Sequence, residues 1–149
     1  MTEGDRERML AVQQSAFDWH LEALRRASAG QRDSGAKLRA AVEVTLGFAS
    51  ARPEEARLLV IETVGGDREL ALRILDHYQR IATLMRAECK ARAGGIPLPG
   101  LTEQALVGAA ASLIGTRIAT GRVDELAELE QELVEFLLLP YSGGHAPAG

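Results

Sequence analysis

Two histidines are the side chains of this sequence best suited to acid–base or hydrogen-bonding chemistry, because imidazole donates, accepts and changes charge near physiological pH. His20 and His77 each lie on an apolar stripe of an expected helix. In one interpretation they line a pocket and orient a ligand through a ring nitrogen. In the other, each is a core or interface histidine bonded to a nearby carbonyl or side chain. The second is favoured for either histidine singly, and the sequence leaves both open.

A carboxylate and several smaller polar side chains interrupt the same apolar helices. Glu62 lies in the apolar run 58–64, where an unpaired carboxylate is costly to bury. It either contacts a ligand or pairs with an arginine such as Arg57 or Arg73, and pairing is favoured. The lesser pocket candidates are Thr45, Thr63, Tyr78 and Cys89, although their spacing with aliphatic residues is also that of an ordinary core.

No arrangement of residues in the sequence indicates catalysis or a metal centre. A zinc site needs three or four converging ligands, and two distant histidines with scattered carboxylates do not supply them. The sequence also has no nucleophile elbow, phosphate-binding glycine loop or paired carboxylates. We therefore expect no catalytic residue, no metal and no cofactor, and a protein that is not an enzyme.

The composition is that of one globular domain of 149 residues. Hydrophobic residues make up 46% and aromatic residues only 4%, so an aliphatic core is expected. The net charge of -4 argues against DNA binding by this chain alone, because DNA affinity depends on cationic side chains. The single Cys89 excludes an internal disulfide, and the longest uncharged run in the helical part, 104–116, is too short to span a bilayer. A cytoplasmic protein without membrane contact is expected.

Hydrophobic periodicity predicts an all-α fold of about six helices. Pro53, followed by two glutamates, is a strong helix start, and Gly65-Gly66 with Asp67 marks an end and a new cap. The expected helices span residues 5–29, 34–50, 53–64, 68–92, 103–120 and 125–139, with an irregular connection at 93–101. Residues 142–149 are expected to form a disordered tail after a single domain at 1–141.

Small residues form one face of the fifth expected helix, and leucines with a phenylalanine form a stripe on the sixth. The small residues are Gly108, Ala111, Ser112 and Gly115, and the stripe is Leu126, Leu129, Leu133 and Phe136. The small face either allows close approach at a dimer interface or packs on the sixth helix of the same chain. The interface is favoured, because a terminal two-helix hairpin must bury its outer leucines.

Two segments carry a resemblance to a known family. The first runs from Leu98-Pro99-Gly100 through Gly121 to Leu139-Pro140-Tyr141, and resembles the C-terminal helical hairpin of TetR-type transcriptional regulators. The second, residues 53–66, resembles another recurrent pattern of that family, in which a short helix with a late glutamate precedes a small-residue turn. Together the two patterns, in the correct order and spacing, account for about residues 5–141.

The resemblance implies an orthogonal helical bundle whose last two helices form a four-helix bundle across the two-fold axis of a homodimer. The remaining helices would surround a small-molecule pocket. The ligand-binding residues expected from it are Phe17, Trp19, His20, Leu46, Glu62, Thr63, His77, Tyr78 and Ile81. The expected dimer interface consists of Val107, Gly108, Ala111, Ser112, Gly115, Leu126, Leu129, Leu133 and Phe136.

The function implied is that of an effector-binding and dimerisation domain that senses a small, mainly apolar ligand. No helix-turn-helix pattern fits into residues 1–4, so DNA would be contacted only through a helix-turn-helix domain absent from this chain. The alternative is a DNA-free helical interaction protein that dimerises with a full-length regulator or modulates it.

Overall fold

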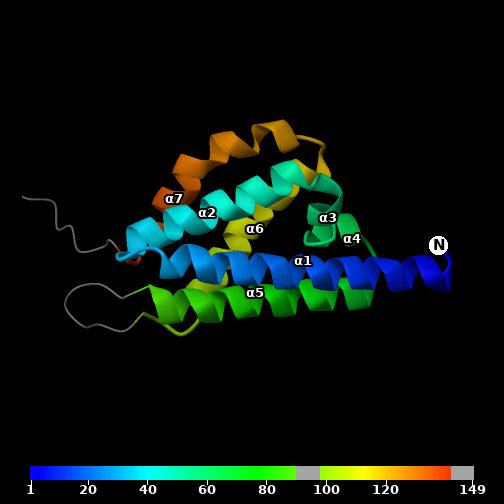
Figure 1. The fold of residues 1–149 in the computed structure, drawn as a ribbon, viewed down its shortest axis with the longest axis horizontal. Helices are drawn as coiled ribbons and strands as arrows, with labels where there is room; N and C mark the ends of the chain where they lie inside the picture. Colours follow the sequence, from blue (N-terminus) through cyan, green and yellow to red (C-terminus); the bar gives the residue numbers. More distant parts are fainter. Residues whose placement is uncertain (90–97, 142–149) are drawn as a thin grey trace, which may run out of the picture.

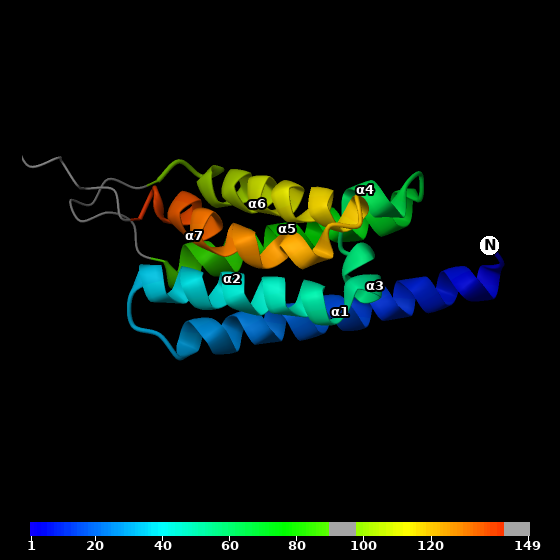
Figure 2. The ribbon, with the colours of Figure 1, turned by 90° about the horizontal axis from the view of Figure 1, so that it is seen from above.

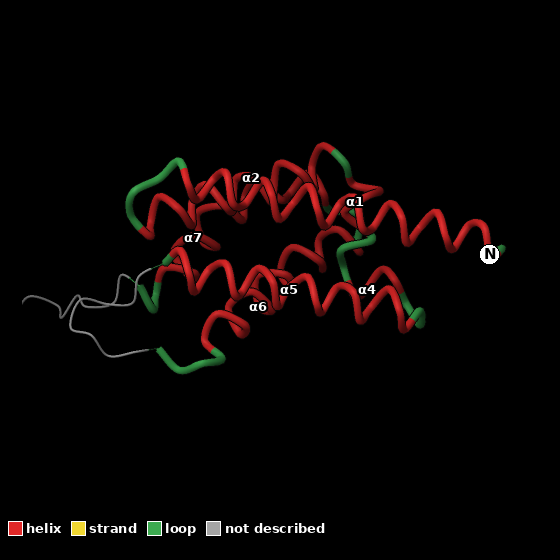
Figure 3. Tube along the Cα trace, turned by 60° about the horizontal axis from the view of Figure 1, so that its bottom comes forward, coloured by secondary structure: helices red, strands yellow, loops and turns green. Residues whose placement is uncertain are grey.

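The computed structural model describes residues 1–89 and 98–141, and all regular secondary structure in this part of the chain is helical (Figures 1 and 3). The elements are α1 (Glu3–Ala29), α2 (Ser34–Ala51), α3 (Pro53–Arg57), α4 (Ile61–Val64), α5 (Arg68–Glu88), α6 (Thr102–Ala119), the 3-10 helix η1 (Val123–Leu129) and α7 (Glu130–Leu138). The predicted all-α class is confirmed. All six predicted helical segments are present, although two of them are broken.

Local sequence sets the beginnings of the long helices. Thr2 and Asp5 form a reciprocal capping box at the start of α1. Asp33 and Asp67 accept hydrogen bonds from backbone amides of the first turns of α2 and α5. These caps satisfy amide groups that have no partner within a helix.

The long helices surround a common centre. α1 packs on α2 and on α5, α2 packs on α7, and α5 packs on α6. Figure 1 shows α1 and α5 side by side, and Figures 1 and 2 both show the first turns of α1 projecting beyond the rest of the bundle. None of the helices in the described residues is both long enough and apolar enough to cross a lipid bilayer.

The predicted helix 53–64 is wrong as a continuous element. Val60 has an extended backbone (φ -118°, ψ 122°) and separates α3 from α4. The break frees the carbonyl of Leu58, which accepts a hydrogen bond from Nε2 of the buried Gln13 at 2.8 Å. Nε2 of Gln13 also donates to the carbonyl of Leu70 at 3.1 Å. At Leu58, a side chain of α1 thus replaces the backbone hydrogen bond that a continuous helix would have formed.

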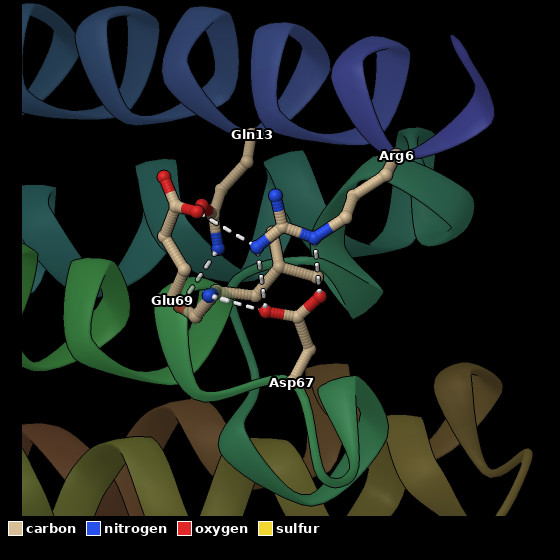
Figure 4. A network of polar contacts seen from close by, with 5 residues as sticks. Arg6, Gln13, Asp67 and Glu69 are labelled. Atoms are coloured by element: carbon tan, nitrogen blue, oxygen red, sulfur yellow. Dashed lines mark hydrogen bonds and ion pairs between the residues drawn. The ribbon is translucent and has the colours of Figure 1, made fainter. Parts of the chain in front are cut away.

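Figure 4 shows the polar network that joins α1 to the beginning of α5 beside this break. Arg6 forms ion pairs with Asp67 at 3.1 Å and with Glu69 at 2.7 Å. Gln13 lies about two turns further along α1, where it is completely buried. The projecting start of α1 is therefore fixed to the bundle by a charged contact, followed by a buried amide.

The C-terminal half differs from the predicted hairpin. The predicted helix 125–139 is a 3-10 helix, η1, followed by the α-helix α7. η1 contacts α6, whereas α7 packs along α2. The predicted end of the fourth helix at residue 92 is also wrong, because Cys89 is already extended (φ -101°, ψ 125°). Residues 90–97 and the predicted tail 142–149 lie outside the described residues.

Candidate functional site

A partly enclosed cavity of about 170 Å³ lies at the centre of the helices. A cavity needs only about 10–15 Å³ to hold one water, so this one has room for an organic molecule. Its walls come chiefly from α1, α2, α5, α6 and α7. The aliphatic lining includes Leu24, Leu38, Val42, Ile81, Leu84, Val107, Ile114, Leu133 and Leu137. An apolar ligand would therefore find complementary walls on all of these helices.

Three polar side chains from three helices form a continuous hydrogen-bonded chain at the cavity wall. Nδ1 of His20 on α1 lies 3.0 Å from Nε2 of His77 on α5. Nε2 of His20 lies 2.8 Å from Oγ1 of Thr45 on α2. All three residues line the cavity, and the two histidines are almost completely buried. We refer to His77, His20 and Thr45 together as the His–His–Thr chain.

Burial keeps both imidazoles of the His–His–Thr chain uncharged at neutral pH. It lowers the pKa of His20 to about 4, because the charged ring would lose its hydration. The pKa of His77 is lowered to about 3, first by burial and then by the positive charges of His20 and Arg80. Each contact in the chain is therefore an ordinary neutral hydrogen bond in which one partner carries the proton.

A second polar cluster lies at the other end of the cavity, where Lys37 and Glu88 are partly exposed to solvent. Nζ of Lys37 lies 3.0 Å from Oε2 of Glu88, and Oγ of Ser28 donates to the same oxygen at 3.0 Å. These hydrogen bonds, from Lys37 and then Ser28, lower the pKa of Glu88. Lys37 and Thr45 are eight positions apart on α2, which is about 12 Å along the helix axis.

The structure separates the predicted ligand-binding residues into two groups. His20, His77, Tyr78 and Ile81 line the cavity. The hydroxyl of Tyr78 donates to the carbonyl of Leu59 at 3.0 Å. Whether these four bind a ligand stays a prediction.

Phe17, Trp19, Leu46 and Thr63 are not among the residues that line the cavity. Phe17 belongs to a separate apolar cluster, and its ring stacks on that of His77 with the ring centres 4.4 Å apart. Trp19 is 43% exposed and stacks on Phe48. Leu46 is buried in the core outside the lining, and Thr63 donates to the Val60 carbonyl at 2.9 Å. Adjacent positions on a helix point about 100° apart, so only part of each predicted stripe faces the cavity. The side chain of Glu62 lies outside what the structure describes.

The predicted dimer-interface residues are also divided. Leu126, Leu129 and Leu133 are buried in the core of this same chain, so the leucine stripe is not a free surface. Val107 and Gly115 are buried as well, and Val107, Ala111 and Leu133 line the cavity. Phe136 packs against the core from a half-buried position. Of the predicted set, only Gly108 and Ser112 are exposed.

The sequence did not predict the second polar cluster, which consists of Ser28, Lys37 and Glu88. Lys37 and Glu88 are 51 positions apart, and neither belongs to a local motif. Thr45 appeared only as a lesser candidate, because a threonine on an apolar stripe is common in any core. The spacing of single helices carries no signal for contacts that form between three helices.

The order hydroxyl, imidazole, imidazole is that of a nucleophile, a base and an orienting group. A general base works best with a pKa near the working pH, and the pKa of His20, at about 4, is well below neutrality. Burial also raises the pKa of the Cys89 thiol to about 11, which leaves little thiolate. In the described residues, no three His, Cys, Asp or Glu side chains are grouped as metal ligands. The arrangement suits hydrogen bonding to a bound molecule better than bond cleavage.

Comparison with known proteins assigns no family to this chain. A scan against protein-family models, a search of curated proteins and a search of solved structures each found no match. The cavity and its two polar clusters are therefore the features from which a function can be inferred.

Proposed function

We propose that this chain is the effector-binding and dimerisation domain of a TetR-like transcriptional regulator, and that its cavity binds a small, mainly apolar molecule. The ligand-binding part rests on the cavity of about 170 Å³, whose lining is mainly apolar and includes two polar clusters. The regulatory part is supported by the resemblance of residues 53–66 and 98–141 to that family. A cytoplasmic location and the lack of a cofactor belong to the same proposal.

The apolar walls would supply most of the binding free energy. Transfer of one CH₂ group out of water contributes about 0.8 kcal/mol, so a ligand with about seven apolar carbons gains roughly 5–6 kcal/mol. Losses of translational and rotational freedom reduce this gain. The polar clusters would then determine how the ligand is oriented, and which ligands are accepted.

The experiment is a thermal-shift screen of small apolar compounds that carry one polar group. A ligand at about 100 times its Kd adds about 2.7 kcal/mol to the stability of the folded state. This corresponds to an increase in Tm of roughly 5–10 °C for a domain of this size. The variant Ala111→Phe places a ring in the cavity, whereas its control, Ala105→Phe, changes an exposed position of the same helix. Ligand stabilisation that survives in Ala111→Phe but not in Ala105→Phe would contradict the proposal.

We further propose that the chain forms a homodimer through the exposed face of α6. This face carries Gly108, Ser112 and Leu113, and Leu113 is 45% exposed. The leucines that were expected to join it are used inside the chain, so the proposed interface is smaller than the sequence predicts. Small residues would allow a second α6 to approach closely.

In this proposal, DNA would be contacted only through a helix-turn-helix domain that lies outside these 149 residues. The alternative is a DNA-free interaction protein that pairs with a full-length regulator through the same face of α6. Coexpression with a regulator that carries such a domain would separate the two proposals. Recovery of stable mixed dimers that no longer shift operator DNA supports the alternative, and homodimers alone argue against it.

A further inference from the structure

One end of the cavity carries two charged side chains, whereas the polar side chains at the other end are uncharged. Among its lining residues, Lys37 and Glu88 are the charged ones, and they neutralise each other at the partly exposed end. The His–His–Thr chain lies about two turns of α2 away, at a stretch of wall with aliphatic neighbours. A bound molecule that reaches the His–His–Thr chain therefore contacts polar groups that carry no net charge.

Binding of a charged ligand group beside the His–His–Thr chain would be energetically unfavourable. Burying a carboxylate or an ammonium group removes its hydration, and only a partner of opposite charge compensates that loss. The histidines are not such partners at neutral pH, because burial keeps both of them uncharged. A hydroxyl or carbonyl group loses much less hydration, and one hydrogen bond compensates for it.

The His–His–Thr chain can serve either kind of neutral group. If Nδ1–H of His20 donates to His77, then Nε2 of His20 accepts the proton of the Thr45 hydroxyl, and Oγ1 of Thr45 is left as an acceptor. If Nε2–H of His77 donates to His20, then Nε2–H of His20 donates to Oγ1 of Thr45. The hydroxyl proton of Thr45 is then available to a ligand carbonyl. Exchange between the two orders needs only tautomer changes.

We propose that the cavity selects an uncharged, mainly apolar molecule that carries one hydroxyl or carbonyl group, and that Thr45 Oγ1, at the end of the His–His–Thr chain, hydrogen-bonds that group. Carboxylates and ammonium compounds of the same shape are rejected. Thr45 is then the residue that determines specificity, and the two histidines position and polarise its hydroxyl. The inference rests on the proposed ligand-binding function of the cavity.

The experiment compares four molecules that share one ring: toluene, benzyl alcohol, benzoate and benzylammonium. A cavity of about 150 Å³ in another protein holds benzene, so the ring is of suitable size. Binding to the full chain is measured by titration calorimetry at pH 7.5. We expect benzyl alcohol to bind several-fold to about tenfold more tightly than toluene, which is the usual effect of one hydrogen bond. Benzoate and benzylammonium should bind at least tenfold more weakly than the alcohol.

Two variants test the residue itself. Thr45→Val has nearly the same shape without the hydroxyl and should lower the affinity for benzyl alcohol to that for toluene, leaving toluene unchanged. Thr45→Ser keeps the hydroxyl and should retain the preference. Equal binding of benzoate and benzyl alcohol, or an unchanged alcohol preference in Thr45→Val, would overturn the inference while toluene binding still supports the apolar cavity. Failure of all four molecules to bind would overturn both.

Discussion

The hydroxyl of Tyr141 donates a hydrogen bond to Oε1 of Glu103 at 2.9 Å, which ties the chain after α7 to the first turn of α6. Glu103 is only 3% exposed, and its other oxygen accepts from Nε of Arg86 at 2.8 Å. Burial raises the pKa of Glu103, but the hydrogen bonds from Arg86 and Tyr141 outweigh burial and the pKa is lowered. Arg86 also donates to the carbonyl of Pro99 at 2.7 Å. Glu103 and Arg86 together thus connect α5, α6, the segment before α6 and the residues that follow α7.

Removal of the Tyr141 hydroxyl should destabilise the fold more than removal of the other tyrosine hydroxyl. A hydrogen bond to a charged group contributes about 1.5–3 kcal/mol, against about 0.5–1.5 kcal/mol for a neutral pair. Tyr141→Phe removes a bond to a carboxylate, and Tyr78→Phe removes a bond to a carbonyl. Urea unfolding of both variants gives the comparison. Equal losses of stability would argue against an ionised Glu103 as the partner of Tyr141.

The stability of the chain should fall as the pH is lowered from about 6.5 to 4. The pKa values of His20 and His77 are about 4 and 3 in the folded state, against an ordinary value of 6.5. The unfolded state therefore binds protons first, and each histidine removes stability by up to roughly 1.4 kcal/mol per pH unit in this range. Carboxylates with lowered pKa values, such as Glu103, lose their contribution only at lower pH.

The control for this pH dependence is the double variant His20→Gln, His77→Gln. Its free energy of unfolding, measured by urea titration at pH 7, 6, 5 and 4.5, should change much less with pH than that of the parent chain. Equal slopes in the two proteins would show that these histidines are not held neutral by burial.

Gln13→Leu should cost about 1–3 kcal/mol, the usual penalty when buried backbone carbonyls lose a donor. The leucine would fit the apolar surroundings but would leave the carbonyls of Leu58 and Leu70 without this amide. Gln14→Leu, one position further along α1 and exposed, is the matched control. Hydrogen exchange should show the largest increase at α3 and α4 in the Gln13 variant. A loss of stability no greater than that of the control would contradict the role assigned to Gln13.

Two glycine substitutions should act in opposite directions. Gly47 lies within α2, and an added Cβ there meets open space, so Gly47→Ala should stabilise the chain by about 0.5–1 kcal/mol. Gly121 has φ +73° just after α6, a conformation that alanine adopts with strain, so Gly121→Ala should destabilise it. Thermal unfolding measures both. The same sign for both substitutions would contradict one of these backbone assignments.

The proposed dimer is tested at Gly108, where an added Cβ also meets open space in the single chain. Gly108→Arg should convert a dimer to a monomer, because a long cation cannot be accommodated between two closely packed α6 helices. Gly47→Arg, at an exposed position of α2, should leave the dimer intact. Light scattering at micromolar concentration reports the mass. A monomeric parent chain, or a dimeric Gly108→Arg variant, would reject this interface.

Local sequence by itself determined the all-α class and most helix starts. Asp33 and Asp67 are capping residues that act within their own first turn, and Pro53 begins α3 as its fixed φ favours. The apolar stripes also identified His20 and His77 as residues that interrupt the core. These features depend on neighbours a few positions away, which a single sequence displays directly.

Only the tertiary structure determined which part of the molecule each apolar stripe packs against. The donor that breaks the predicted helix at Val60 comes from Gln13, 45 positions before Leu58. The leucines at 126, 129 and 133 face the chain's own core, because η1 packs on both α2 and α6, and α7 packs along α2. Likewise, Thr45 joins His20 and His77 only because α1, α2 and α5 meet at one wall of the cavity. Periodicity shows that a face is apolar, but the partner of that face depends on how all the helices bury their surfaces together.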